Sequence, residues 1–485
     1  MTYKGKGEIL IMEKTVKLES NMLQGSLWKP VLLFALPLAA TGILQQLFNA
    51  ADIAVVGQFT QERGAIAMAA VGANSPVVAL LLNFFVGISL GSNVVIANAL
   101  GSGHHKVVHS AIGTSILLAL AGGVIMGVLG ELIAGPLFAS LNVPEEVMEM
   151  AVLYFRIYML GMPVILLYNF EAAILRGAGD TRTPLMVLTL SGIINVILNL
   201  VFVIGMGMAV EGVAIATVVS NLVSSVVLLF KLLRSETEIR LDIRNFSFDK
   251  GVLIRILRIG VPAGIQSSVF SIANVIVQGA TNSLGTIVMA ASSAAMNIEI
   301  FAFNVFQSFG QACTTFVGQN YGANHVARCK QVLKVCWIES AVLTILSIVL
   351  IISVGKNLLA IFNGDPEVIE TGYMRMCIIF PAYIFSLTYD SISGYLRGFG
   401  ISLLPAVLTT IAICGSRITW VYFVFPLAPT FFTIMAIFPI SLGLAALFLV
   451  IALFIKKPAG TILKRQQVQA GSVEEEKEQE MAVQM

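Results

Sequence analysis

The stretch Leu175-Arg-Gly-Ala-Gly-Asp-Thr-Arg-Thr-Pro184 returns later in the chain as Leu396-Arg-Gly-Phe-Gly-Ile-Ser-Leu-Leu-Pro405. A shift of 221 residues relates the two copies, and the same shift pairs further identical residues across some 115 positions, such as Gly101 with Gly322. Both copies interrupt long apolar stretches. An internal duplication in an apolar chain is typical of secondary transporters, whose halves are structural repeats.

The composition indicates a membrane protein. Of 485 residues, 57% are hydrophobic and 12% are charged, and the mean hydropathy is +0.90, whereas about a quarter of the residues in soluble domains are charged. Because a helix needs about 20 apolar residues to cross the hydrocarbon, the chain divides into twelve such segments, six in each half. We place these predicted spans at residues 30–57, 66–99, 107–137, 146–175, 184–206, 211–231, 252–279, 287–319, 330–359, 368–396, 402–425 and 430–455.

The predicted fold is an all-α membrane protein of two pseudo-symmetric six-helix lobes. With twelve spans both chain ends lie on one side, and 24 of the 29 Lys and Arg residues fall on that side. The positive-inside rule then makes both ends cytoplasmic. The predicted divisions are a cytoplasmic N-terminal tail, a first lobe, a cytoplasmic linker, a second lobe and a disordered cytoplasmic tail, at residues 1–25, 26–235, 236–250, 251–456 and 457–485.

The sequence shows no residue pattern typical of an enzyme active site or a metal site. The five cysteines lie within or beside apolar spans without metal-ligand spacing, so we interpret them as packing thiols. No His-Glu-x-x-His motif occurs, and no catalytic dyad is evident. We expect no enzymatic activity, no cofactor and no nucleic-acid partner, and a monomer surrounded by lipid.

A few ionisable residues fall deep inside predicted spans. Each costs several kcal/mol in hydrocarbon, which marks it as a functional candidate. Arg375 and three other charged residues lie nearer span ends, where snorkelling to the interface is sufficient. For Arg417, an internal salt bridge to Glu299 or Asp390 is the structural alternative. The deep set comprises Asp52, Glu171, Glu299, Asp390 and Arg417.

The first lobe collects oxygen-bearing side chains in three spans. Asn195 and Asn199 are four residues apart and therefore share one helical face, Thr217 follows in the next span, and Asp52 belongs to the first. Carboxylate, amide and hydroxyl oxygens suit a hard cation such as sodium, and a carboxyl removed from water can also hold a proton at neutral pH. Ordinary interhelical hydrogen bonding is the alternative role for the two Asn residues.

At this point the chain resembles the multidrug and toxic compound extrusion (MATE) family, over roughly residues 26–456. The motifs that carry the resemblance are Asn49-x-x-Asp52-x-x-x-x-Gly57, the two Leu-Arg-Gly segments, Gln319-Asn-Tyr-Gly322 and Cys414-Gly-Ser-Arg417-Ile-Thr-Trp420. The resemblance implies two lobes around a central cavity that opens alternately to either side. It also implies that the coupling cation binds Asp52, Asn195, Asn199 and Thr217. Asn199 replaces an acid of the family pattern, so proton and sodium coupling both stay open.

The predicted function is therefore a cation-coupled antiporter in the cell membrane that exports amphiphilic, mainly cationic organic compounds. Four buried carboxylates against one buried Arg favour cationic substrates, and Glu171, Glu299, Asp390 and Arg417 are the candidates for substrate contact. The alternative is a flippase of a lipid-linked precursor from the same superfamily. Such flippases usually have fourteen spans and a basic cavity, which counts against that alternative.

Overall fold

The computed structural model describes residues 22–59, 64–141, 143–244 and 246–462. The regular structure in these residues is entirely helical. The helices are α2 (Trp28–Phe59), α3 (Gly64–Gly101), α4 (His105–Ser140), α5 (Glu145–Leu160), α6 (Met162–Gly177), α7 (Arg182–Leu200), η2 (Val201–Gly205), α8 (Val210–Leu233), α9 (Lys250–Asn282), α10 (Thr286–Gly322), α11 (Val326–Ser353), α12 (Gly355–Phe362), α13 (Pro366–Gly398), α14 (Leu403–Thr409), η3 (Thr410–Gly415), α15 (Ser416–Thr419), η4 (Trp420–Val424), η5 (Phe425–Leu427) and α16 (Phe431–Lys456).

The predicted count of twelve spans is confirmed. Eleven helices, or runs of helices, are long and apolar enough to cross a membrane, and α5 with α6 forms a twelfth span bent by 50°. The bend falls at Gly161, between the end of α5 and the start of α6, whose second residue is Pro163. The ninth predicted span runs too far, because α11 ends at Ser353 and the short α12 follows separately.

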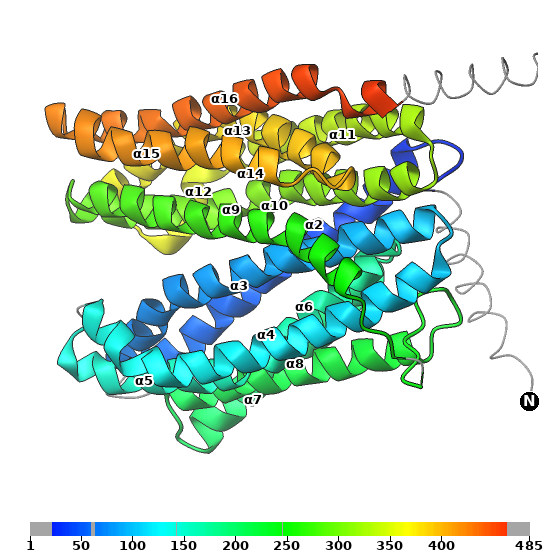
Figure 1. The fold of residues 1–485 in the computed structure, drawn as a ribbon. Helices are drawn as coiled ribbons and strands as arrows, with labels where there is room; N and C mark the ends of the chain where they lie inside the picture. Colours follow the sequence, from blue (N-terminus) through cyan, green and yellow to red (C-terminus); the bar gives the residue numbers. More distant parts are fainter. Residues whose placement is uncertain (1–21, 60–63, 142, 245, 463–485) are drawn as a thin grey trace, which may run out of the picture.

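Two hydrophobic cores organise the helices into two lobes, seen as the lower and upper groups in Figure 1. One core draws on residues 55–259 and the other on residues 22–38 and 277–459. The beginning of α2 therefore packs in the second core, and the beginning of α9 packs in the first. The helices α2 and α9 therefore connect the two lobes.

The lobes meet on the side where the described chain begins and ends, which we call the terminal face (Figure 1). Gly87 of α3 lies so close to Gly264 of α9 that a Cβ there would overlap the facing backbone. Toward the middle of the same helix pair, Asn83 Nδ2 donates to Ser271 Oγ at 3.2 Å. Toward the opposite, distal face the lobes diverge (Figure 1), so the molecule is closed at its terminal face.

Candidate functional site

The first-lobe site depends on how closely α2 approaches α7. Gly192 of α7 faces the ring of Phe48, and any Cβ at Gly192 would overlap that ring. Asp52 follows Phe48 by one helical turn, and Asn195 follows Gly192 by about one turn, so the contact sets both polar side chains at one level. The packing of a glycine against an aromatic ring thus brings the polar groups together.

Four predicted residues of the first lobe gather at this level, in the half of the lobe nearer the distal face. Asn199 Nδ2 donates to Asp52 Oδ1 at 2.6 Å and to Asn195 Oδ1 at 3.3 Å. Thr217 Oγ1, from α8, lies 3.4 Å from Asp52 Oδ2, and the same hydroxyl lies 2.9 Å from the carbonyl oxygen of Val213. The carboxyl therefore contacts one amide and one hydroxyl from two other helices.

The carboxyl of Asp52 lies in a nearly closed, uncharged environment. Asp52 is 9% exposed, and within the described part of the chain no Lys, Arg or His forms an ion pair with it. Asn199 Oδ1 is buried without a hydrogen-bond partner in the same region. A buried carboxylate without a cationic partner is costly, and binding of a proton or a metal cation would remove that cost.

The second lobe holds a buried ion pair that the sequence did not predict. Arg375 of α13 donates from Nε to Glu299 Oε1 at 2.8 Å and from Nη2 to Glu299 Oε2 at 3.1 Å. Arg375 is only 2% exposed, and its guanidinium carbon lies 5.2 Å from the ring centroid of Phe438. The interpretation of Arg375 as a snorkelling residue near a span end is therefore wrong.

Arg417 does not form the salt bridge considered from the sequence. Its Nη1 donates to Asn274 Oδ1 at 2.6 Å and its Nε to Ser441 Oγ at 3.2 Å. Its guanidinium carbon also lies over Phe438, 4.8 Å from the ring centroid. The predicted excess of carboxylates does not hold in this cluster, because Arg375 neutralises Glu299 and Arg417 adds a positive charge.

Glu171 and Asp390 are packed inside their lobes in this conformation. Glu171 has no exposed surface, and its Oε2 accepts a hydrogen bond from Ser225 Oγ at 3.0 Å. Asp390 lies against Gly310 of α10 so closely that a Cβ on that glycine would overlap the carboxylate. One oxygen of each acid is buried without a hydrogen-bond partner. Their predicted contact with substrate stays a prediction.

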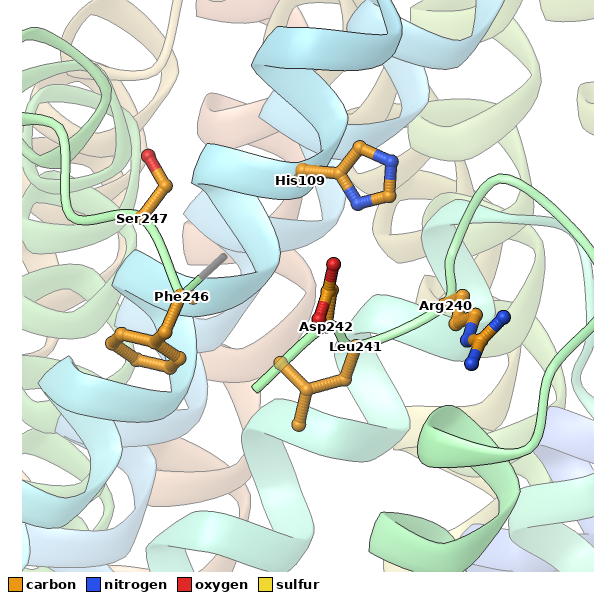
Figure 2. Close-up of a pocket in the computed structure, with 7 residues that line it drawn as sticks. His109, Arg240, Leu241, Asp242, Phe246 and Ser247 are labelled. Atoms are coloured by element: carbon orange, nitrogen blue, oxygen red, sulfur yellow. The ribbon is translucent and has the colours of Figure 1, made fainter. Parts of the chain in front are cut away.

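Two cavities at the terminal face contain none of the eight predicted site residues. The first has a volume of about 10 Å³, room for about one water. Figure 2 shows its His109, projecting from α4 toward the loop that carries Arg240 and Asp242. The second is a groove of about 1380 Å³ between α3, α9 and α14, with Arg258 among its lining residues. Among the described residues, no three His, Cys, Asp or Glu side chains gather as a metal site.

The MatE family model matches residues 37–201 and 262–423. The chain belongs to the MATE family. The two matched segments correspond to the two lobes, and they begin at Pro37 and Pro262, two prolines 225 residues apart that occupy corresponding positions in the two repeats. The family identified from the motifs is thereby confirmed, and the protein is a multi-pass membrane transporter of the multidrug efflux type.

Curated relatives of this MATE chain carry more than one substrate description. Probable multidrug resistance protein NorM of Thermotoga maritima is 30% identical over 402 residues, covering 80% of this chain and 84% of that protein. Probable multidrug resistance protein YoeA of Bacillus subtilis is 29% identical over 401 residues, covering 81% and 86%. A protein of Shewanella oneidensis described as an FAD transporter is 26% identical over 323 residues, covering 64% and 70%.

Solved structures show the same fold. A multidrug resistance MATE family transporter of the MOP superfamily, described in an outward-facing conformation, superposes with a TM-score of 0.82 at 21% identity. The match covers 91% of this chain and 98% of that one. The predicted two-lobe architecture is confirmed.

Proposed function

We propose that this MATE protein is a cation-coupled antiporter that exports amphiphilic organic compounds by alternating access. The observation that carries the proposal is the Asp52 carboxyl, buried among neutral oxygen and amide groups without a cationic partner. Such a group favours binding of one cation per cycle, because a bound proton or sodium neutralises a carboxylate that is otherwise buried without a cationic partner. Asn195, Asn199 and Thr217 complete the proposed coupling site.

In the proposed mechanism, coupling arises from opposite preferences of the two ligands. A ligand shifts a two-state equilibrium only by its differential affinity for the two states. A proton or sodium that reaches Asp52 from outside neutralises the carboxyl and repacks α2 against α7, which reduces the space in the first lobe. The organic compound is released outward, and cation release to the cytoplasm restores the site.

The proposal includes the orientation of the protein in the membrane and its oligomeric state. The terminal face is assigned to the cytoplasm, since it carries most Lys and Arg residues and such residues concentrate in cytoplasmic loops. The chain acts as a monomer in the cell membrane, contacts lipid and organic substrate, and catalyses no covalent reaction. With the terminal face closed, the described conformation is the outward-facing one.

Imposed gradients test the proposal directly. We expect vesicles that contain the purified protein to move a fluorescent organic compound when an inward-directed cation gradient is applied. A pH gradient and a sodium gradient are imposed separately, and the active one should raise the initial rate about tenfold over symmetric conditions, within the usual range of coupling free energies. Transport that ignores both gradients would exclude coupled antiport.

The ion is tested by restoring the acid of the family pattern. Asn199→Asp places a second carboxyl where Asn199 Nδ2 now lies, 2.6 Å from Asp52 Oδ1. Two adjacent carboxylates repel unless a cation lies between them, so sodium should bind about tenfold more tightly than to the wild type. Isothermal titration with sodium measures the change, and Asn195→Ala, which removes a proposed ligand without adding charge, should not tighten sodium binding. Unchanged sodium affinity would place Asn199 outside the cation site.

The chemical class of the substrate has a second candidate, a compound that carries an anionic group. A flippase of a lipid-linked precursor requires a cationic group that recognises phosphate, and one relative is described as an FAD transporter. Among the described residues of the second lobe, Arg417 contacts only neutral hydrogen-bond partners. Its charge is therefore the observation that favours anionic groups on the substrate as a second candidate.

A further inference from the structure

The charges of the second lobe do not balance in the cluster around Phe438. Arg375 and Arg417 both lie over this ring, with guanidinium carbons 5.2 Å and 4.8 Å from its centroid. Among the described residues, Glu299 supplies the single carboxylate of the cluster, and both of its oxygens accept hydrogen bonds from Arg375. The cluster therefore carries one uncompensated positive charge, which belongs to Arg417.

Arg417 is 94% buried, since its exposed fraction is 6%. Its contacts with Asn274, Ser441 and Phe438 are to neutral groups, and in the described residues no carboxylate forms an ion pair with it. Charge in a membrane interior is costly, and such residues are usually paired or mark a substrate path. Neutral oxygens offset part of this cost but leave the net charge in place.

The surroundings of Arg417 hold its guanidinium in a fixed orientation. The bonds to Ser441 and Asn274 use Nε and Nη1, which leaves Nη2 without a hydrogen-bond partner in the described part of the chain. Asn274, which receives one of these bonds, is itself exposed. The guanidinium thus keeps Nη2 free beside an exposed polar side chain, and charge-assisted hydrogen bonds from such donors are how arginine binds oxyanions.

We propose that Arg417 is a substrate-binding residue that recognises an oxyanion, a carboxylate or phosphate, on an amphiphilic compound. The inference rests on the proposed transport function and names its substrate class. The Phe438 ring and neighbouring apolar groups bind the organic body of the compound.

Matched dyes test this inference. The first pair is a cationic rhodamine ester and the same rhodamine as its free carboxylic acid, and the second pair is riboflavin and riboflavin phosphate. Fluorescence anisotropy with the purified full chain measures each Kd without any gradient. We expect Arg417→Gln to weaken binding of the acid or of the phosphate at least tenfold, because a charge-assisted hydrogen bond is lost, and to change ester and riboflavin binding less than twofold. The pair that responds identifies carboxylate or phosphate.

Two further variants separate binding from structure. Arg417→Lys keeps the charge but loses the bonds that orient the guanidinium on Ser441 and Asn274, and should recover only part of the oxyanion affinity that Arg417→Gln loses. Arg255→Gln removes an exposed arginine of α9 and should change neither dye pair. Parallel losses for both members of each pair, or no binding of either anionic dye to the wild type, would overturn the inference. Failure of ion coupling would instead appear as gradient-insensitive transport with these affinities intact.

Discussion

Asp52→Asn is expected to abolish gradient-driven efflux while leaving the protein folded. The substituted amide retains the size of the carboxyl and can still exchange hydrogen bonds with Asn199 and Thr217, which now contact the two oxygens of Asp52 at 2.6 Å and 3.4 Å. It cannot gain or lose charge. Because coupling depends on that change of charge, the rate increase of about tenfold that the active gradient causes in the wild type should be lost.

The control for Asp52→Asn is the same kind of substitution at an acidic residue outside the coupling site. Glu146, exposed in the first turn of α5, provides it, and Glu146→Gln should transport at the wild-type rate. Initial rates are measured in vesicles under the active gradient and under symmetric conditions, with substrate affinity measured separately in detergent. If Asp52→Asn retains the rate increase caused by the gradient, the coupling site lies elsewhere in the protein.

Much of the fold can be predicted from the amino-acid sequence alone. Twelve apolar segments and a 221-residue internal shift predict twelve spans in two lobes, since only helices satisfy their own backbone hydrogen bonds in lipid. Most predicted spans fall inside the observed helices. The separate helix α12 and the π-helical segments η2, η3 and η4 were not predicted, because a local change of helical register leaves the apolar pattern nearly unchanged.

The arrangement of the first-lobe site could be predicted only in part from the sequence. A spacing of four places Asn195 and Asn199 on one face of α7, and they do form a hydrogen bond. Their contact with Asp52 depends on the packing of Gly192 against Phe48, a tertiary contact that spacing alone does not specify. The family resemblance, rather than the local pattern, brought these residues together before the structure did.

The second lobe shows where reasoning from span position fails. Arg375 lies nine residues after the first residue of α13, close enough to a span end for snorkelling to explain it. The structure instead directs its side chain inward to Glu299 on α10. Pairing of charges between helices far apart in the chain depends on helix rotation, which charge counting does not predict. The signal that could have found it is the presence of Glu299 itself, which needed a cationic partner.

Glu299→Gln should be the most destabilising single substitution considered for this protein. It leaves Arg375, 2% exposed, without a carboxylate and beside the second guanidinium of Arg417. Removing one partner of a buried ion pair typically costs about 3–5 kcal/mol of the free energy of unfolding. The double variant Glu299→Gln with Arg375→Gln removes the isolated charge together with its partner and should recover most of that loss.

Buried thiols allow the measurement of this loss, since Cys313 and three other free cysteines are inaccessible in the folded chain. A thiol-reactive dye then reports unfolding in detergent as temperature or denaturant rises. Glu370→Gln is the matched control, because it breaks the Glu370 pair with Lys356, in which both side chains are more than half exposed; such surface pairs contribute less than about 1 kcal/mol. Equal stability of Glu299→Gln and Glu370→Gln would show that the Glu299–Arg375 pair is hydrated in the membrane, and the uncompensated charge assigned to Arg417 would then lose its basis.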